Sequence, residues 1–324
     1  MDNVRRHALA AWLPDGYEIV DMALMSGGAI QQNWKLDVMA AGIQQAWVLR
    51  TDSPATLSHS RPRAEEFALL AAAFVNNVTV PEPLMLCTDT SVIGTPFFIM
   101  RRIEGIAAAY RVVRSETLGG GRQHLTARLG RELGRIHAIP PEGLEFLQAH
   151  PDVAPGNRFV AEMRGHLDHG RTPRPALEWG LRHLERYAPA SAGLVLCHND
   201  FRTGNYMVDD AGLNGVLDWE FAGWGDPHED LGWLCARCWR FGSPHEVGGV
   251  GDRDTLYAEY EKVSGRRVDD ARVRYWEIAA TIRWAVIAIS QAERHISGTE
   301  RSLELALTGH IVPELERDVM RATA

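Results

Sequence analysis

Two short apolar runs near the middle of the chain, each leading to a carboxylate, constrain its fold more than any other feature of the sequence. Residues 194–196 lead to Asp200, and residues 215–217 lead to Asp218. Short apolar runs bounded by polar turn residues are typical of buried strands. Residues 209–212, Asp-Asp-Ala-Gly, provide a turn between them. We therefore expect the two acids to lie at the ends of two strands and to face one site.

The residues after the first run have the order His-x-Asp-x-Arg-x-x-Asn, from His198 through Asp200 and Arg202 to Asn205. This spacing fits the catalytic loop of kinase-type phosphoryl transfer, in which one Asp accepts the substrate hydroxyl proton while an Asn and a second Asp hold magnesium. Asp200 and Arg202 are therefore the candidate catalytic residues, with Arg202 near the γ-phosphate. Asn205 and Asp218 are the candidate metal ligands, because Mg²⁺ takes oxygen ligands.

A plain β-hairpin, in which Asp and Asn serve only turn chemistry, is the alternative interpretation. The sequence disfavours it because Asp200 and Asp218 follow apolar runs, whereas Asp209 and Asp210 occupy the turn. His198 has the offset from Asp200 of a residue that orients such a loop, so we interpret it as structural.

Three motifs carry a family resemblance. They are His-Asn-Asp-Phe-Arg-Thr-Gly-Asn at residues 198–205, Val-Leu-Asp-Trp-Glu at residues 216–220 and Gly-Asp-Pro-x-x-Asp-Leu at residues 225–231. Together they resemble the aminoglycoside phosphotransferase family, a branch of the kinase-like fold that phosphorylates small molecules. The sequence is most similar to the kinase-like domain attached to some acyl-CoA dehydrogenases. It departs from the family at Asn199, where the family usually has Gly.

The resemblance implies an α+β, bilobal protein-kinase-like fold, with a small antiparallel-sheet N-lobe and a larger, mainly helical C-lobe. The implied division is a nucleotide-covering lobe at residues 1–100, a connector at 101–105 and a catalytic and substrate lobe at 106–324. The apolar patterns agree with this division, because strands are expected before residue 101 and mostly helices after it. The expected strands include residues 17–25, 30–38 and 44–51, and the expected helices include residues 61–74, 227–240 and 299–319.

Candidate nucleotide contacts begin between the first two expected strands. Gly27 and Gly28 lie in a loop where glycine lets the backbone approach a ligand, and the resemblance makes it a shortened phosphate-covering loop; a plain hairpin turn is the alternative. In the third strand, alternation puts Val48 and Arg50 on one face, so Val48 could cover adenine while Arg50 reaches phosphates. A solvated strand-end charge is the alternative for Arg50, and Lys35 is the alternative phosphate cation.

The resemblance also assigns a glutamate and a connector. The family places a Glu on the helix after the third strand to pair with the strand cation, and Glu66 fits this position better than Glu65. The strand at residues 95–100 then runs into residues 101–105. This segment resembles the lobe connector, whose backbone at Met100, Arg101 and Ile103 would bind adenine.

After Glu220, Asp226 and Pro227 have the pattern of a helix N-cap followed by Pro at the first helical position. Asp230, one turn into this helix, resembles the Asp with which kinase-like folds hold the catalytic loop. Several tryptophans crowd the region, and they either pack in the core or line a cavity for a cationic acceptor. They are Trp219, Trp224, Trp233 and Trp239.

Composition excludes several other classes of protein. The 324 residues carry 34 basic and 42 acidic side chains, a formal net charge of −8, which argues against nucleic acid as a partner. Four cysteines in a chain of this length do not make a disulfide framework, so a cytoplasmic location is expected. Cys235 and Cys238 fit one face of a helix better than a zinc site. The apolar segment 279–290 contains Arg283, so we expect a core helix and no membrane span.

The combined prediction is an ATP- and Mg²⁺-dependent phosphotransferase that acts on a hydroxyl of a small molecule. The alternative is a catalytically inactive nucleotide-binding module that regulates a partner. Asn199, the missing strand Lys and the short glycine loop favour the alternative, and the intact set of Asp200, Asn205 and Asp218 opposes it. The sequence leaves open whether the acceptor is an aminoglycoside, a choline-like compound, a sugar or a hydroxyacyl thioester. It also leaves open the choice between ATP and GTP and the oligomeric state.

Overall fold

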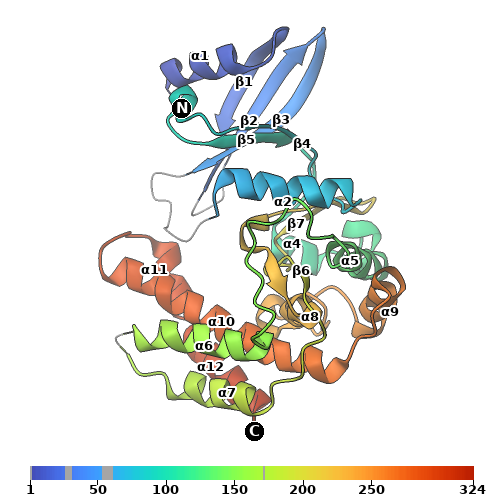
Figure 1. Cartoon of the computed structure of the whole chain (residues 1–324), viewed down its shortest axis with the longest axis vertical. Coiled ribbons are helices and arrows are strands. Elements are labelled where there is room, and N and C mark those ends of the chain that lie inside the picture. The colour runs from blue at the N-terminus through green and yellow to red at the C-terminus, as the bar shows by residue number, and fades with distance from the viewer. Residues whose placement is uncertain (1, 26–30, 53–60, 171) are drawn as a thin grey trace.

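The computed structural model describes residues 2–25, 31–52, 61–170 and 172–324, and it has an α+β fold of two lobes (Figure 1). The smaller lobe is built on an antiparallel five-stranded sheet with the strand order β1-β2-β3-β5-β4. The turn between β2 and β3 uses Ala41 and Gly42, both at positive φ, which matches the right-handed twist of a tight hairpin. The five strands are β1 (Tyr17–Leu24), β2 (Gln31–Ala40), β3 (Ile43–Asp52), β4 (Pro83–Cys87) and β5 (Phe97–Arg101).

Helices cover both faces of this sheet. The short helices α1 (Asn3–Trp12) and α3 (Thr90–Ile93) lie on one face, where Leu9 of α1 packs with Trp47 and Leu49 of β3. Helix α2 (Arg63–Val75) lies on the other face, toward the larger lobe (Figure 1). Phe98 of β5 stacks edge-on against Phe67 of α2 at 5.9 Å. The strand alternation therefore turns Val48 and Arg50, which share the face of Phe98, toward the space between the lobes.

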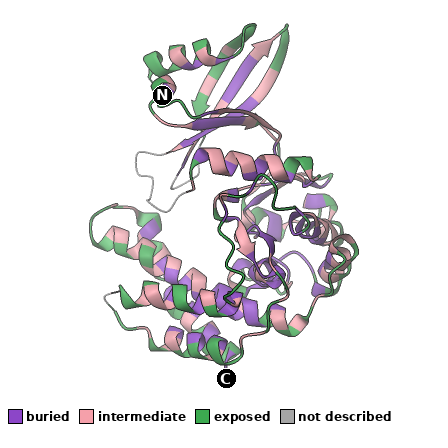
Figure 2. Ribbon diagram, in the orientation of Figure 1, coloured by how far each residue is buried: buried purple, intermediate pink, exposed green. Residues whose placement is uncertain are grey.

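The larger lobe is mainly helical, and Figure 2 shows buried residues gathered on the facing sides of its helices. The long α10 packs against α6, α7, α8, α11 and α12, and α5 packs against α9. None of the helices in the described ranges has both the length and the hydropathy needed to span a bilayer. The helices of this lobe are α4 (Ala109–Arg114), α5 (Arg122–Ile136), α6 (Pro155–Asp168), α7 (Pro175–Arg186), α8 (Pro227–Cys235), α9 (Arg253–Ser264), α10 (Asp270–Ile296), α11 (Leu303–Gly309) and α12 (Val312–Ala322), with 3₁₀ turns η1 (Leu118–Gly120), η2 (Trp219–Phe221) and η3 (Arg237–Trp239).

Two helices differ from the sequence prediction. The helix expected over residues 227–240 ends at Cys235, because the backbone becomes extended at Ala236 and resumes as the 3₁₀ turn η3. The single helix expected over residues 299–319 is two helices, α11 and α12. Pro313 lies in the first turn of α12, where its missing N–H costs nothing, but it could not continue α11.

The two acidic strand ends belong to two separate two-stranded sheets. β6 (Val195–Cys197), which precedes Asp200, pairs with β9 (Gly223–Gly225). β8 (Leu213–Val216), which precedes Asp218, forms a hairpin with β7 (Tyr206–Val208). The turn of this hairpin is closed by Asp209, whose Oδ1 accepts hydrogen bonds from the backbone N–H groups of Ala211 and Gly212.

Hydrogen bonds of the His198 ring and of the backbone connect the two strand ends. The ring of His198 bonds the carbonyl oxygen of Leu217 through Nε2 at 2.9 Å, and its Nδ1 accepts from the N–H of Asp200 at 3.2 Å. The N–H of Leu217 in turn donates to the carbonyl oxygen of Asn205 at 2.8 Å. His198 therefore has the structural role predicted for it.

Asp230 of α8 holds the loop between β6 and β7. Its Oδ2 accepts from the N–H of His198 at 2.7 Å and its Oδ1 from the N–H of Asn199 at 2.8 Å, while His137, which directly follows α5, lies 3.2 Å from Oδ2. Burial acts to raise the pKa of Asp230, but the hydrogen bond and charge of His137 and the other donors outweigh it and hold the pKa below its usual range. Asp226 caps the same helix through the N–H of His228, as the sequence predicted.

Asn199 has φ 63°, in the left-handed region. Glycine adopts this conformation without strain, and asparagine is among the side chains that tolerate it best. This conformation accounts for Asn at a position where the family usually has Gly. The side chain adds a hydrogen bond, from Nδ2 to the carbonyl oxygen of Phe221 at 3.0 Å.

Glu132 of α5 joins the sheet lobe to the core of the helical lobe. Its side chain is fully buried and accepts from the N–H of Thr79 at 2.8 Å and from the Thr79 hydroxyl at 3.0 Å. Arg128 and Arg135 pair with the same carboxylate. The carbonyl oxygen of Thr79 accepts from the N–H of Val216, so the carboxylate fixes the segment that supports β8.

Glu132→Gln is expected to lower the free energy of unfolding by about 1–3 kcal/mol, because an amide replaces a buried charge that accepts several hydrogen bonds. Urea unfolding followed by circular dichroism measures the loss. Glu259→Gln is the matched control: its partly exposed pair with Arg131 should contribute less than about 1 kcal/mol. Equal losses in the two variants would show that Glu132 does not brace the lobes.

Replacing Asn199 separates backbone strain from side-chain bonding. Asn199→Gly and Asn199→Ala both remove the bond to Phe221, but only Ala places a Cβ in a left-handed conformation. We expect the Gly variant to be more stable than the Ala variant by about 1 kcal/mol in urea unfolding. An Ala variant as stable as the Gly variant would contradict the strain argument.

Candidate active site

Asp200 lies at the centre of the site, held by three side chains. Its Oδ1 accepts from the indole Nε1 of Trp233 at 3.0 Å and from Nε of Arg202 at 3.1 Å, and its Oδ2 accepts from the amide of Asn205. Burial raises the pKa of Asp200, while the charges of Arg202 and His198 act in the opposite direction. The carboxylate is thus fixed in direction and only 15% exposed, which suits a group that accepts a proton.

Asn205 is linked to Asp218 through the backbone of Leu217. The Asn205 amide nitrogen donates to the carbonyl oxygen of Asp200 at 3.0 Å and to the Asp200 side chain, so its amide oxygen points away from Asp200. The carbonyl oxygen of Asn205 accepts from the N–H of Leu217, the residue before Asp218. Asp218 has φ 61° and a side chain that is 39% exposed. An amide oxygen and an accessible carboxylate are ligands that fit Mg²⁺.

Arg50 links the sheet to this site. Its Nε lies 2.8 Å from Glu66 of α2, and its Nη2 lies 3.2 Å from Asp218. Burial acts to lower the pKa of Arg50, but the charges of Glu66 and Asp218 outweigh it, so the side chain stays charged. Lys35 pairs instead with Asp37 at 2.8 Å. Of these two cations, Arg50 is therefore the one that contacts the candidate metal ligand.

A second arginine completes the ion-pair group around Glu66. Arg63 of α2 is 1% exposed and pairs with both Glu66 and Asp52, the latter at 3.0 Å. Glu65, the other glutamate on α2, pairs with Arg61 at 3.0 Å. The structure thus separates the two glutamates, with Glu66 facing Arg50 and Glu65 facing the helix start.

Glu220 and Arg61 also contact this site, although neither was predicted from the sequence to belong to it. The amide of Gln31 donates to Glu220 at 2.7 Å, and burial raises the pKa of Glu220 to about 7 against the opposing charge of Arg50. Arg61 donates to the carbonyl oxygens of Glu220 and Ala222 at 3.2 and 2.7 Å, which ties α2 to the segment after Asp218. The second acid two residues after Asp218 is the sequence feature that could have identified Glu220 as a site residue.

The candidate adenine side lies where β3 and β5 meet. Val48 is 7% exposed and pairs with Met100 across the sheet. The side chain of Arg101, the first connector residue, pairs with Glu82 at 2.6 Å. Only the backbone of Arg101 is therefore left for the predicted adenine contact. Among the described residues, no partner is seen for the N–H of Ile103. Residues 27 and 28, the predicted glycine loop, lie outside the described residues.

Aromatic and cationic side chains form the wall beyond Asp200. The guanidinium carbon of Arg202 lies 4.5 Å from the ring centre of Trp239, and that of Arg283 lies 5.3 Å from the ring centre of Trp233. The two indoles also contact each other at 5.2 Å. Trp219 packs in the main core and is 2% exposed, while Trp233 and Trp239 are also buried, at 5% each, in a separate apolar cluster. Sequence reasoning missed Arg283 because it lies far along the chain.

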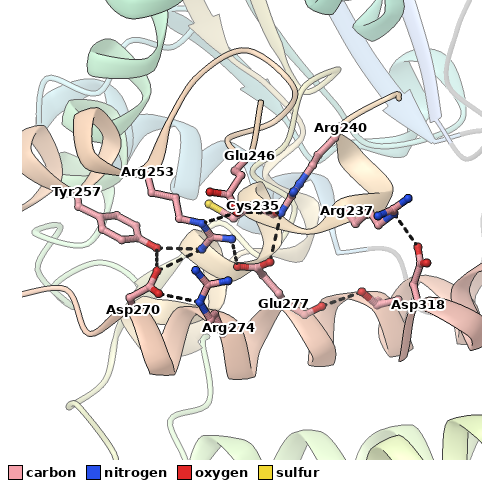
Figure 3. Close-up of polar contacts among 11 residues, drawn as sticks. Cys235, Arg237, Arg240, Glu246, Arg253, Tyr257, Asp270, Arg274, Glu277 and Asp318 are labelled. Atoms are coloured by element: carbon pink, nitrogen blue, oxygen red, sulfur yellow. Dashed lines mark hydrogen bonds and ion pairs between the residues drawn. The ribbon is translucent and has the colours of Figure 1, made fainter. Parts of the chain in front are cut away.

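A polar cluster fixes the turn that carries Trp239 (Figure 3). Arg240 donates to the carbonyl oxygen of Cys235 at 2.8 Å and lies 3.4 Å from Glu277 of α10. Arg253 reaches the same Glu277 carboxylate at 2.5 Å. At the other end of the turn, Arg237 and Asp318 of α12 are 3.3 Å apart. These ion pairs anchor η3 to the C-terminal helices and so set the position of Trp239.

The cysteines do not form a metal site. All four thiols are free, and burial raises the pKa of Cys238 to about 12 and that of Cys235 further. In the described part of the chain, the trio close enough to share a cation is His137, Cys197 and Asp230. Asp230 already accepts two backbone N–H groups there, and burial raises the pKa of the Cys197 thiol, so the trio is a structural contact.

Comparisons with known proteins agree with this architecture. The model of the phosphotransferase enzyme family matches residues 21–268. Acyl-CoA dehydrogenase family member 10 of Mus musculus is 30% identical over 217 residues, which are 64% of this chain and 20% of that protein. The chain therefore spans about a fifth of the length of this relative.

Solved structures share the fold at low sequence identity. A protein of Ralstonia eutropha assigned as an aminoglycoside phosphotransferase superimposes with a TM-score of 0.77 at 21% identity, over 98% of both chains. Spectinomycin phosphotransferase in complex with ADP and spectinomycin superimposes with a TM-score of 0.62 at 12% identity, over 94% of both chains. These matches confirm the predicted kinase-like α+β fold. Because the model of the phosphotransferase enzyme family covers most of this chain, the chain belongs to that family, which is the aminoglycoside phosphotransferase family predicted from its motifs.

Proposed function

We propose that this protein transfers the γ-phosphoryl group of ATP to a hydroxyl of a small molecule, with Mg²⁺ as cofactor. The observation that carries the proposal is the hydrogen-bonded unit of Asp200 and Asn205, joined through Leu217 to Asp218. It combines a fixed proton acceptor with two oxygen ligands for a hard cation. Family membership supports phosphoryl transfer as the reaction.

Each residue would have a distinct role in the reaction. Asp200 orients the acceptor hydroxyl and accepts its proton as the hydroxyl oxygen attacks the γ-phosphorus. Arg202, held against the carboxylate of Asp200, offers its guanidinium to the transferring phosphoryl group. Asn205 and Asp218 would hold the magnesium ion, which supplies charge neutralisation on the phosphates when bound. Arg50, fixed by Glu66, would exchange part of its contact with Asp218 for a phosphate oxygen.

The nucleotide would lie between residues 1–100 and residues 106–324. Val48 would cover the adenine, and the backbone of the connector 101–105, with the N–H of Ile103, would bond its edge. Gly27 and Gly28 would cover the phosphates. The free cysteines support a cytoplasmic site of action, where thiols stay reduced.

The inactive-module alternative has one supporting observation. Arg50 stands where protein kinases use a Lys, and it pairs with Asp218, one of the two candidate metal ligands. A protein that binds ATP but transfers no phosphate to any acceptor would favour this alternative.

Asp200→Asn tests the proton acceptor. We expect the transfer rate, measured as ADP release with kanamycin, choline, glucose or a hydroxy acid as acceptor, to fall about 10²- to 10⁴-fold, because an amide cannot take the proton. ATP affinity measured by calorimetry should stay near the wild-type value. Asp210→Ala changes an exposed acid in the nearby turn and should leave the rate unchanged. Parallel loss of ATP binding and transfer in Asp200→Asn would refute the assignment.

Asp218→Ala tests the metal site by calorimetric titration of ATP with and without magnesium. In the wild type, magnesium is expected to tighten ATP binding by about tenfold or more, because it links Asn205 and Asp218 to the phosphates. The variant should lose this gain, whereas Asp210→Ala should keep it. A magnesium effect that survives in Asp218→Ala would place the metal elsewhere.

A further inference from the structure

Arg283 of α10 lies beside the proposed base, and neither the reaction nor the nucleotide accounts for it. Its Nη1 donates to the carbonyl oxygen of Asn199 at 3.3 Å, and Asn199 immediately precedes Asp200. Its guanidinium lies over the ring of Trp233, whose Nε1 donates to Asp200. Trp233 therefore contacts both Asp200 and Arg283.

The charges on this side of Asp200 do not cancel. Among the described residues, Arg283 makes no ion pair with a carboxylate, whereas Arg202 pairs with Asp200. Glu229 lies near Arg283 in the same hollow, but burial raises its pKa to about 8 against the opposing charges of Arg158 and Arg283. Burial therefore favours the neutral form of Glu229, and in the described part of the chain no ion pair joins it to Arg283. The acceptor side keeps an excess positive charge.

The aromatic wall of this region does not suit a cationic acceptor. A ligand cation would need an open ring face, but Arg202 and Arg283 already lie on the faces of Trp239 and Trp233. The same cations would repel it. The hollow beside Arg283 is otherwise lined mostly by apolar side chains, namely Phe159, Trp233, Trp276, Ala279 and Ala280.

We propose that Arg283 binds an oxyanion on the acceptor, so that the hydroxyl compound phosphorylated by this protein carries a carboxylate or phosphate next to an apolar part. This proposal rests on the proposed phosphotransferase function. The guanidinium fork can bond both oxygens of such a group, while the stacked Trp233 keeps it beside Asp200. Arg283 is then a specificity-determining residue, and the acceptor class is anionic.

Matched acceptors test the proposal by calorimetry on the full chain, with and without magnesium and a non-hydrolysable ATP analogue. The anions are 3-hydroxyoctanoate and glycerol 3-phosphate, which distinguish a carboxylate from a phosphate. Their neutral counterparts are methyl 3-hydroxyoctanoate and glycerol, and choline is the cation. In the wild type we expect at least one anion to bind about tenfold more tightly than its neutral counterpart and than choline.

The variants locate this preference. Arg283→Gln should remove the roughly tenfold advantage of the anion while changing the affinity for the neutral compound by less than about twofold. Arg283→Lys keeps the charge without the fork, so it should retain part of the advantage and also serves if the Gln variant does not fold. Arg274→Gln, an exposed arginine on the same helix, is the control and should behave as the wild type.

Three outcomes would overturn the proposal: tighter binding of choline than of either anion, no binding of any anion, or equal weakening of all compounds by Arg283→Gln. The last would mean that Arg283 only braces Asn199. ADP release measured with the same compounds tests the phosphotransferase function separately from the anionic acceptor. Arg283-dependent anion binding without phosphoryl transfer would refute the phosphotransferase function alone, whereas transfer to choline or kanamycin but to neither anion would refute the anionic acceptor alone.

Discussion

The site depends on one buried carboxylate, that of Asp230. It accepts two consecutive backbone N–H groups, from His198 and Asn199, and so fixes the chain just before Asp200. A buried charge is costly unless it is well bonded, and here three donors from two elements satisfy it. Because the bonded segment includes a left-handed residue, the loop adopts a conformation that local preferences alone would not favour. The direction of Asp200 therefore depends on α8, through Asp230 and Trp233, as well as on contacts within the loop.

A second set of ion pairs couples the lobes. Arg50 of the sheet contacts both Glu66 of α2 and Asp218 of the larger lobe. Arg61 at the start of α2 bonds the backbone after Asp218. A rotation of α2 would move both connections together, so the position of this helix and the geometry of the candidate metal ligands are physically linked. Glu220 accepts a hydrogen bond from Gln31 of the sheet, and burial raises its pKa to about 7 against the charge of Arg50.

The proposed acceptor side and the proposed nucleotide side are formed by different elements of the fold. Its walls are set by the packing of α8, η3 and α10, and the ion pairs of Glu277 with Arg240 and Arg253 hold that packing (Figure 3). Asp200, Asn205 and Asp218 lie within the motifs that carry the family resemblance, whereas Trp239 and Arg283 lie outside them. Family membership consequently bears on the reaction more closely than on the acceptor, and the proposal for the acceptor rests on Arg283.

The sequence by itself determined the features whose physical causes are local. The spacing of Asp200, Asn205 and Asp218, the shared face of Val48 and Arg50, and the N-cap at Asp226 all depend on residues a few positions apart or on strand periodicity. The tertiary structure decided the rest. Trp233 and Arg283 lie 33 and 84 positions after the residues that they contact, so only the packing of α8 and α10 brings them to Asp200 and Asn199. The protonation of Glu220 and Glu229 likewise depends on burial, which no local pattern encodes.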